Sequence, residues 1–280
     1  MFIVHKGVIW MLIATFFFSL MGTFVKLGGE NFNSTELVFY RSLISLFIII
    51  GIMKFNKISY SSNYLKLHMI RSSIGFFSLL FFFYAINHLP LSTAMSLNFS
   101  HPLFLGLLMP LILNRKIKTS LFLMILIGFI GVFFILKPTF ENQSYFAGLI
   151  GLISGLGAAI AYLYVTRLGQ LKEPDLRTIF YFTLISTICS AIMMFFGEIH
   201  KIHYKYILIL LGLGISATIA QIAITKAYRV GNTLGNAGLS YLTIIFSTII
   251  GVVWLDEFID KQTAFGIMLI IISGIFASKK

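Results

Sequence analysis

Ten apolar runs, most of them close to twenty residues long, follow one another along the chain with only short polar breaks between them. A hydrocarbon core of about 30 Å is crossed by about 20 helical residues, so each run is expected to form one membrane-spanning helix. The runs lie near 7–27, 35–53, 68–88, 91–113 and 119–137 in the first half, and near 146–166, 178–197, 206–227, 232–254 and 263–278 in the second. The pattern therefore predicts an all-α integral membrane protein with ten transmembrane helices.

The breaks between the runs are short and polar, as in GGENFN after the first run and LDEFIDKQ after the ninth. The longest break, Lys54 to Leu67, is about 14 residues long, which is too short to contain a soluble domain. The first run, Val8 to Leu27, is too long for the apolar core of a signal peptide and lacks a small-residue cleavage site. It is expected to be retained as the first span.

The chain repeats itself at a fixed shift of about half its length. Residues 39–45 read FYRSLIS, and residues 180–186 in the other half read FYFTLIS. The shift that superimposes these two stretches, or one longer by a single position, aligns four further pairs: Gly7 with Gly148, Lys26 with Arg167, Ala85 with Ala227 and Phe104 with Phe246. Such self-similarity indicates a duplicated unit, so residues 1–140 and 141–280 are expected to form two five-helix repeats. Because five is odd, the second repeat would be inverted in the membrane, an arrangement typical of secondary transporters.

The composition excludes a soluble globular protein. Hydrophobic residues make up 58% of the chain and charged residues 11%, whereas soluble domains average about 45–50% and about 25%. The net charge is +12, but the basic residues lie in short loops between apolar runs, as topology signals do and nucleic-acid-binding patches do not. Cys189, the single cysteine, lies inside an apolar run, so neither an intramolecular disulfide nor a metal cluster is expected.

The lysines and arginines are divided unequally between the two ends of the predicted helices. Fifteen lie on the side of the N-terminus, five lie on the opposite side, and Arg41 lies inside the second span. The fifteen are Lys6, Lys54, Lys57, Lys66, Arg71, Arg115, Lys116, Lys118, Arg167, Lys172, Arg177, Lys226, Arg229, Lys279 and Lys280. Because positively charged loops stay in the cytoplasm, both termini are predicted to be cytoplasmic in a bacterial inner membrane.

Three stretches resemble the EamA family of the drug/metabolite transporter superfamily. FYRSLIS with Arg41 resembles the arginine segment early in that family's second span. Arg71 followed by FFFYAINHLPLSTA and SHPLF resembles its passage from span 3 to span 4, and WLDEF followed by Gly266 and Gly274 resembles its ending. One departure is NRKIK, which stands in the first half where the family usually places an acid. The resemblance covers nearly the whole chain. It implies alternating access and leaves the cargo open, because relatives carry amino acids, nucleosides, vitamins or S-adenosylmethionine.

Polar residues at mid-bilayer depth are the first candidates for a binding site, because hydrocarbon offers them no hydrogen-bond partner. In the fourth span, Asn98 and His101 are three residues apart and are expected to share a helix face. In the ninth span, Asn236, Ser240 and Thr243 follow four- and three-residue steps. The longer of the two repeat shifts places Asn98 on Ser240 and His101 on Thr243, so these residues are expected to line a cavity at the midplane. The alternative is that they only hydrogen-bond neighbouring helices, a contact of about 0.6 kcal/mol.

Three further residues complete the candidate substrate site. Gln221 in the eighth span and Tyr162 in the sixth are suited to read a cargo by hydrogen bonding or stacking. Arg41 is expected roughly 10 Å below the outer surface, at about 1.5 Å per helical residue, and a charge there must face protein or water. It either attracts a carboxylate or phosphate of the cargo, or it is structural and pairs with Glu36 or a backbone carbonyl. His101 is either a proton carrier or a packed, neutral side chain.

These features predict a secondary transporter that moves a small polar organic metabolite by alternating access, with S-adenosylmethionine or an amino acid as the cargo. Within the same family, an exporter of amino acids or other metabolites and an importer of a riboflavin-like vitamin are the alternatives. Outside it, an integral-membrane enzyme is disfavoured because the six histidines are scattered and neither an HExxH motif nor a phosphate-binding loop motif occurs. A channel or a scaffold subunit is the remaining alternative.

The expected partners are the metabolite and the lipid bilayer. No cofactor, metal or nucleic acid is expected, and the chain is expected to be a monomer, with a dimer as the alternative.

Overall fold

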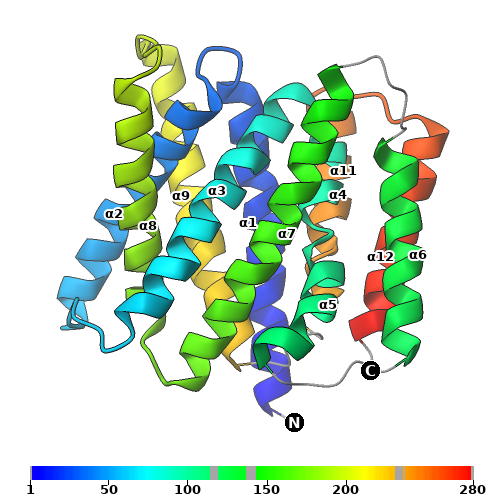
Figure 1. Cartoon of the computed structure of the whole chain (residues 1–280). Coiled ribbons are helices and arrows are strands. Elements are labelled where there is room, and N and C mark those ends of the chain that lie inside the picture. The colour runs from blue at the N-terminus through cyan, green and yellow to red at the C-terminus, as the bar shows by residue number, and fades with distance from the viewer. Residues whose placement is uncertain (1, 114–118, 137–142, 231–235, 237, 279–280) are drawn as a thin grey trace.

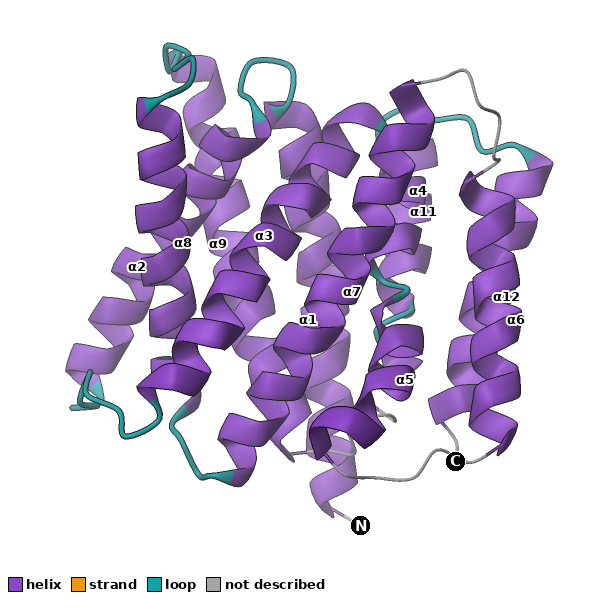
Figure 2. Ribbon diagram, in the orientation of Figure 1, coloured by secondary structure: helices purple, strands orange, loops and turns teal. Residues whose placement is uncertain are grey.

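The computed structural model describes residues 2–113, 119–136, 143–230, 236 and 238–278. These residues form α-helices joined by short turns and loops, with no strand among them (Figure 2). In the first half the helices are α1 (Phe2–Gly28), α2 (Ser34–Phe55), α3 (Leu65–His88), α4 (Leu91–Asn98), α5 (His101–Leu113) and α6 (Thr119–Leu136). In the second half they are α7 (Gln143–Gln170), α8 (Asp175–Phe195), α9 (Tyr204–Val230), α11 (Leu242–Trp254) and α12 (Lys261–Ser278). The predicted all-α class is confirmed.

The helices stand side by side in one bundle (Figure 1). Helices α2 and α8 pack together at one edge, and α6 packs against α12 at the other. Helix α1 packs against α9, and α3 packs against α7, between these edges. Helix α1 begins and α12 ends at the same end of the bundle (Figure 1).

Six of the described helices, α1, α2, α3, α7, α8 and α9, are long and apolar enough to cross a membrane. Helices α6, α11 and α12 contain shorter apolar stretches. Between 44% and 56% of each of the six apolar windows is buried within the protein, while large apolar side chains such as Phe55 and Phe195 are exposed. Helices that are apolar on their outer faces as well as inside match a lipid environment.

The fourth predicted span, 91–113, is not one continuous helix. Helix α4 ends at Asn98 and α5 begins at His101. The cause is Pro102, which has no N–H to donate and whose ring would collide with the carbonyl group of Asn98 in a regular helix. The Ser100 hydroxyl donates a hydrogen bond of 2.7 Å to the carbonyl oxygen of Leu97, which satisfies a backbone group at the break. The expectation that Asn98 and His101 share one helix face is therefore wrong, because the helix changes course between them.

A second break lies at the equivalent place in the other half. Of the described residues in the expected span 232–254, Asn236, Gly238 and Leu239 are helical, Ser240 and Tyr241 form a turn, and the helix resumes as α11 at Leu242. Residues 231–235 and 237, at the start of this expected span, lie outside the described residues. The repeat shift that superimposes FYRSLIS on FYFTLIS places the turn at residues 99–100 on the turn at 240–241, so the two breaks occupy matching positions.

Helix α7 packs closely against the break between α4 and α5. A Cβ atom at Gly155 would lie 2.7 Å from the carbonyl oxygen of Leu97 and 3.0 Å from that of Asn98. A Cβ atom at Gly151, one turn earlier, would lie 3.3 Å from the side chain of Ala85. Small residues permit such close approach between membrane helices. At Gly155 only a glycine fits without movement of backbone.

We expect Gly155→Ala to lower the unfolding temperature of the detergent-purified protein and to reduce its free energy of unfolding by about 1–3 kcal/mol. The reason is that the added methyl group overlaps backbone that has little freedom to move. Gly51→Ala is the matched control, because a Cβ atom at Gly51 meets no atom within 4 Å. This control is expected to be neutral or to stabilise α2 by up to about 1 kcal/mol, since alanine favours helix. Equal unfolding temperatures for the two variants would contradict close packing at the break.

Candidate functional site

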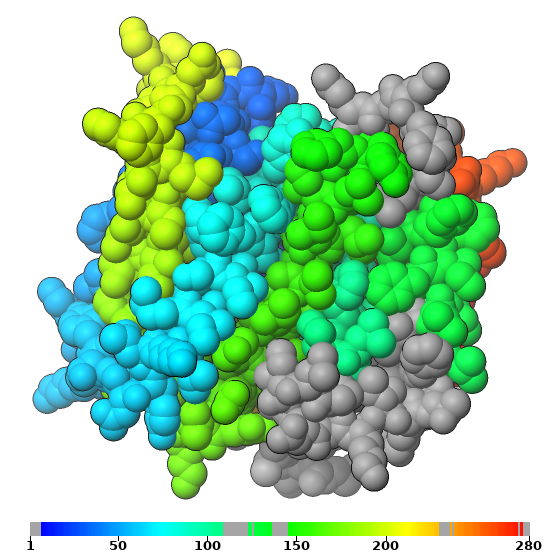
Figure 3. All heavy atoms as spheres, in the orientation of Figure 1, coloured from blue at the N-terminus to red at the C-terminus, as the bar shows by residue number. Residues whose placement is uncertain are grey.

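A cavity lies in the centre of the bundle, where seven helices, α1 to α4 and α7 to α9, each contribute to its wall. Its polar lining consists of Arg41, Arg71, Ser78, Asn98, Tyr162 and Gln221, and its phenylalanine lining consists of Phe18, Phe82, Phe99 and Phe182. Its volume of ≈ 50 Å³ is enough for a few water molecules. Side chains of α3, α7 and α8 cover the interior on the face shown in Figure 3. A cargo of metabolite size would therefore require the helices to move apart.

Two arginines dominate the polar lining. Arg41 from α2 is 1% exposed and Arg71 from α3 is 2% exposed. Both lie against the ring of Phe182 from α8, with the Cζ atom of Arg41 5.1 Å and that of Arg71 4.0 Å from the ring centroid. These are cation–π contacts. They gather three helices around one aromatic ring.

The hydrogen-bonding capacity of the two arginines is largely unused. The Nη2 atom of Arg41 donates to the Oε1 atom of Gln221 over 3.4 Å. In the part of the chain that the structure describes, the Nε and Nη1 atoms of both arginines have no hydrogen-bond partner, and no acidic side chain lines the cavity. A guanidinium group stays charged inside proteins. Placing one at the centre of a membrane helix costs about 2.5–3.5 kcal/mol, so the cavity carries two expensive positive charges.

Arg71 lies deeper than expected. It was counted with the basic residues on the N-terminal side of the spans, but α3 begins at Leu65, so Arg71 lies more than one turn inside the helix and faces the cavity. Of the alternatives for Arg41, the pairing with Glu36 is not formed. The Glu36 carboxylate instead accepts a hydrogen bond of 2.7 Å from the backbone N–H of His200 and lies 2.9 Å from its Nδ1 atom.

Asn98 is held at the cavity wall by a short polar chain. Its Nδ2 atom donates to the Ser154 hydroxyl oxygen over 2.9 Å, and the Ser78 hydroxyl donates to the Ser154 carbonyl oxygen over 2.7 Å. Asn98 is the last residue of α4, so the helix break directs this side chain toward α7 and the cavity. The interaction ties α3, α4 and α7 together beside the arginines.

His101 lies behind the cavity wall. It is fully buried, its Nε2 atom lies 3.3 Å from the Tyr228 hydroxyl oxygen, and its ring centroid lies 5.0 Å from that of Tyr162. Tyr162 in turn stacks on Tyr228 at 4.9 Å. His101 therefore supports Tyr162, which lines the cavity, and does not itself line it.

The predicted residues of the ninth span lie away from the cavity. The Nδ2 atom of Asn236 donates to the carbonyl oxygen of Ala227. Ser240 and Thr243 are fully buried, and the Thr243 carbonyl oxygen accepts a hydrogen bond of 3.0 Å from Ser19 on α1. The structure thus gathers four of the eight predicted site residues around the cavity, namely Arg41, Asn98, Tyr162 and Gln221.

Arg71 and Phe182 are the most prominent of the cavity residues that were not predicted from the sequence. The signal for Arg71 was present: a charged residue at the start of an apolar run, followed by the stretch FFSLLFFFYA. The signal for Phe182 was its equivalence to Arg41 in the alignment of FYRSLIS with FYFTLIS. Within the described residues, no three His, Cys, Asp or Glu side chains gather as a metal site requires.

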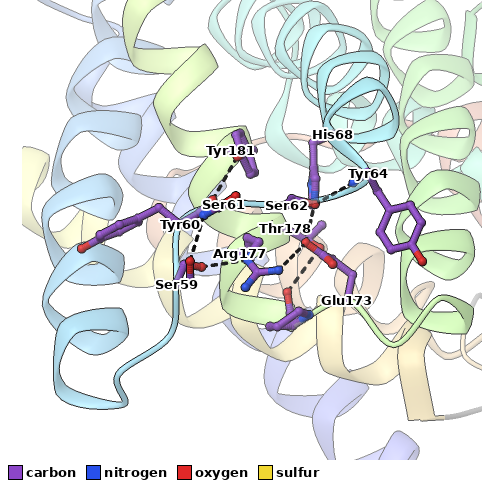
Figure 4. A network of polar contacts seen from close by, with 11 residues as sticks. Ser59, Tyr60, Ser61, Ser62, Tyr64, His68, Glu173, Arg177, Thr178 and Tyr181 are labelled. Carbon is purple, nitrogen blue, oxygen red and sulfur yellow. Dashed lines mark hydrogen bonds and ion pairs between the residues drawn. The ribbon is translucent and has the colours of Figure 1, made fainter.

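Polar contacts also join α2 and α8 to loops at opposite ends of the bundle. We call the first set the Glu173 cluster; it contains Ser59, Tyr60, Ser62, His68, Glu173, Arg177 and Tyr181 (Figure 4). The Glu173 carboxylate lies 3.1 Å from His68 Nε2 and 2.9 Å from Arg177 Nη1. The Arg177 Nε atom donates to the carbonyl oxygen of Ser59 over 2.8 Å, and the Tyr181 hydroxyl donates to that of Tyr60 over 3.0 Å. The start of α8 is thus fastened to the loop between α2 and α3.

The second set, the Glu36 cluster, contains Asn33, Glu36, Glu198 and His200. Besides its contacts to His200, the Glu36 carboxylate accepts a hydrogen bond from the backbone N–H of Asn33 over 2.8 Å. The Asn33 Nδ2 atom donates to the carbonyl oxygen of Glu198 over 3.1 Å. The start of α2 is thus fastened to the loop between α8 and α9, which is the reciprocal of the Glu173 cluster.

The Glu173 cluster predicts a pH-dependent contribution to stability. Burial alone would raise the pKa of Glu173, but hydrogen bonds from Ser62, Arg177 and His68 outweigh it and hold the pKa below its ordinary value. Because the folded-state pKa is lowered, the stabilisation is complete above the unfolded-state pKa and disappears as the pH falls through the lowered value. Glu173→Gln is expected to lower the free energy of unfolding by about 1.5–3 kcal/mol at neutral pH. The difference in stability between this variant and wild type should shrink below about pH 4.

The measurement is thermal unfolding of both proteins in detergent between pH 3.5 and pH 7.5. Glu30→Gln is the control, because Glu30 is exposed, and a surface substitution of this kind is expected to change stability by less than about 0.5 kcal/mol. A Glu173→Gln difference that stays constant over the whole pH range would contradict the assignment.

Comparisons with protein families and with known proteins agree with the bundle of membrane helices described above. The model of the EamA-like transporter family matches the chain twice, over residues 5–137 and 146–278. An uncharacterized transporter of Helicobacter pylori is 30% identical over 278 residues, which cover 96% of this chain and 93% of that protein. A pseudopaline exporter of Pseudomonas aeruginosa is 27% identical, with coverage of 99% and 97%.

An S-adenosylmethionine uptake transporter of Rickettsia prowazekii is 26% identical, with coverage of 97% and 92%. One solved crystal structure superimposes with a TM-score of 0.77 at 17% identity, covering 98% of this chain and 96% of that one. At that identity the structural match supports the fold alone.

Proposed function

The chain belongs to the EamA-like transporter family, and on that premise we propose that it moves a small polar organic metabolite across the bacterial cytoplasmic membrane by alternating access. It is a multi-pass membrane transporter, and the relatives named above are transporters and not enzymes. The observation that carries the proposal is the central cavity, which combines charged, hydrogen-bonding and aromatic groups in the interior of a bundle of apolar helices. Intramembrane polar groups of this kind mark substrate pathways.

The proposed architecture is ten membrane-spanning helices in two inverted repeats, residues 1–140 and 141–280. Three observations support it: the family model matches each half over its length, the helix breaks at residues 99–100 and 240–241 fall at matching positions, and α1 begins at the same end of the bundle at which α12 ends. Transporters of this type bind cargo where discontinuous helices meet near the midplane. With Arg71 reassigned to the cavity, fourteen basic residues remain on the N-terminal side against five, which supports cytoplasmic termini.

The proposed cargo is S-adenosylmethionine or an amino acid. The relative from Rickettsia prowazekii is named for uptake of S-adenosylmethionine, and the relative from Pseudomonas aeruginosa is named as an exporter. Tyr162 offers a flat surface for an adenine or an aromatic side chain, while Asn98 and Gln221 offer hydrogen bonds to an amino-acid group. Because one named relative takes up its substrate and another exports its substrate, the experiment must detect transport in either direction.

The test is counterflow in proteoliposomes with labelled S-adenosylmethionine or labelled amino acids outside, in the presence and absence of the same unlabelled compound inside. Alternating access predicts that internal cargo accelerates uptake. A channel predicts uptake that internal cargo does not accelerate, and a scaffold subunit predicts no uptake by protein that is shown to be folded.

In the same assay, Tyr162→Leu is expected to raise the KM of the cargo. Loss of one aromatic stacking contact, about 0.5–1.5 kcal/mol, corresponds to a rise of roughly 2- to 12-fold. Tyr204→Leu is the control, because Tyr204 is 88% exposed and its variant should match wild type. An unchanged KM for Tyr162→Leu in folded protein would remove Tyr162 from the binding site.

A further inference from the structure

The central cavity lacks negative charge to balance its two arginines. Four acids that the structure describes are engaged elsewhere. Glu36 binds His200, Glu173 binds His68 and Arg177, Asp175 binds Arg229, and Glu257 accepts hydrogen bonds from the backbone N–H of Leu91 close to Lys26. The other described acids, Glu30, Glu198, Asp256 and Asp260, stand in loops outside the bundle's centre. A counter-charge for Arg41 and Arg71 must therefore come from outside the described chain.

The free hydrogen-bond donors indicate what that counter-charge is. Nε and Nη1 of Arg41 and of Arg71 are buried without partners among the described residues, and both side chains face the cavity. Guanidinium N–H groups donate strong hydrogen bonds to the oxygens of a carboxylate or phosphate group. Phe182 holds both forks against one ring, so a single anionic group placed beside that ring would be within reach of both.

Much of the remaining wall is apolar and aromatic. Phe18, Met21, Phe82 and Phe99 line the cavity next to the arginines. Apolar walls with a few polar groups that fix orientation are typical of sites for small organic molecules. A bare inorganic anion would use the arginines and leave this surface without a role.

From these observations we propose that the cargo is an organic molecule with an anionic group, whose carboxylate or phosphate binds between Arg41 and Arg71 while its apolar part packs against the phenylalanines. This inference rests on the proposed transport function and adds the chemical class of the cargo. A zwitterionic amino acid satisfies it through its carboxylate. A cargo without a carboxylate or phosphate group does not.

A structural role for the arginines makes the opposite prediction about stability. If Arg71 mainly stabilised the fold, Arg71→Gln would lower the unfolding temperature of the cargo-free protein. If Arg71 serves the cargo, removing a buried and unpaired charge should leave that temperature unchanged or raise it. Gln221→Glu is a second variant that does not remove an arginine. Because Gln221 accepts a hydrogen bond from Arg41, a carboxylate at this position would act as an internal anion.

The experiment is thermal unfolding of the detergent-purified full chain with matched probes. 3-Phenylpropionate, phenylalanine and phenyl phosphate represent organic anions, 3-phenylpropionamide and phenylalaninamide are their uncharged or cationic counterparts, and inorganic phosphate is tested alone. The organic anions are expected to raise the wild-type unfolding temperature by about 2–5 °C at concentrations well above Kd. The amides are not expected to raise the unfolding temperature. A comparison of the shifts produced by the carboxylate probes and by phenyl phosphate then shows which anionic group the site prefers.

Both Arg71→Gln and Gln221→Glu are expected to lose this shift. Arg229→Gln, which removes the same charge from an ion pair with Asp175 outside the cavity, should keep it. An equal shift from the amides, a full shift in Arg71→Gln or no shift from any anion would overturn the proposal. A shift from inorganic phosphate as large as that from phenyl phosphate would overturn its organic part.

Counterflow separates this proposal from the transport function. Counterflow of a neutral cargo, undiminished in Arg71→Gln, would sustain transport and overturn the anion site. A thermal shift with organic anions but no counterflow would sustain the anion site and overturn transport.

Discussion

The burial of two guanidinium groups against the single ring of Phe182 is the constraint on which the rest of the bundle depends. Each cation–π contact contributes about 2 kcal/mol when desolvated, whereas each charge costs about 2.5–3.5 kcal/mol at membrane depth. The ring therefore offsets much of the cost but not all of it. What remains is a positive potential at the centre of the protein, and α2, α3 and α8 must pack at the depth where Arg41, Arg71 and Phe182 meet.

The duplication and the cavity are connected through the same residues. Arg41 and Phe182 occupy equivalent positions in the two copies of the repeat, and in the structure they contact each other across the two halves. In the proposed inverted arrangement, residues near the pseudo-two-fold axis meet their own equivalents, so a difference between the copies becomes a contact between unlike side chains. The Glu36 and Glu173 clusters also join the two halves, at the two ends of the bundle. The Glu36 cluster fastens the start of α2 to a loop of the second half, and the Glu173 cluster fastens the start of α8 to a loop of the first half.

The apolar pattern predicted the helices well, because a membrane helix needs a long apolar run and little else. It missed the break between α4 and α5, since Pro102 acts on the carbonyl group four residues earlier and a hydropathy pattern does not register that. Arg71 was misplaced because the apolar run begins at residue 68, whereas α3 begins at Leu65. His101 was expected at the cavity because a regular helix would have directed it there with Asn98. The contact of Phe182 with both arginines depends on packing between helices distant in sequence, which a local pattern does not contain.

Gly155 also limits how α7 can move relative to α4. Its backbone lies so close to the carbonyl groups of Leu97 and Asn98 that α7 has no clearance to roll or slide over the end of α4. Hydrogen bonds from Asn98 and Ser78 to Ser154 join α3 to the same unit. Helices α3, α4 and α7 are therefore joined as one closely packed unit. In the proposed alternating access the opening would lie at the border of this unit, and Phe182, carried by α8, stands on the far side of that border from Arg71.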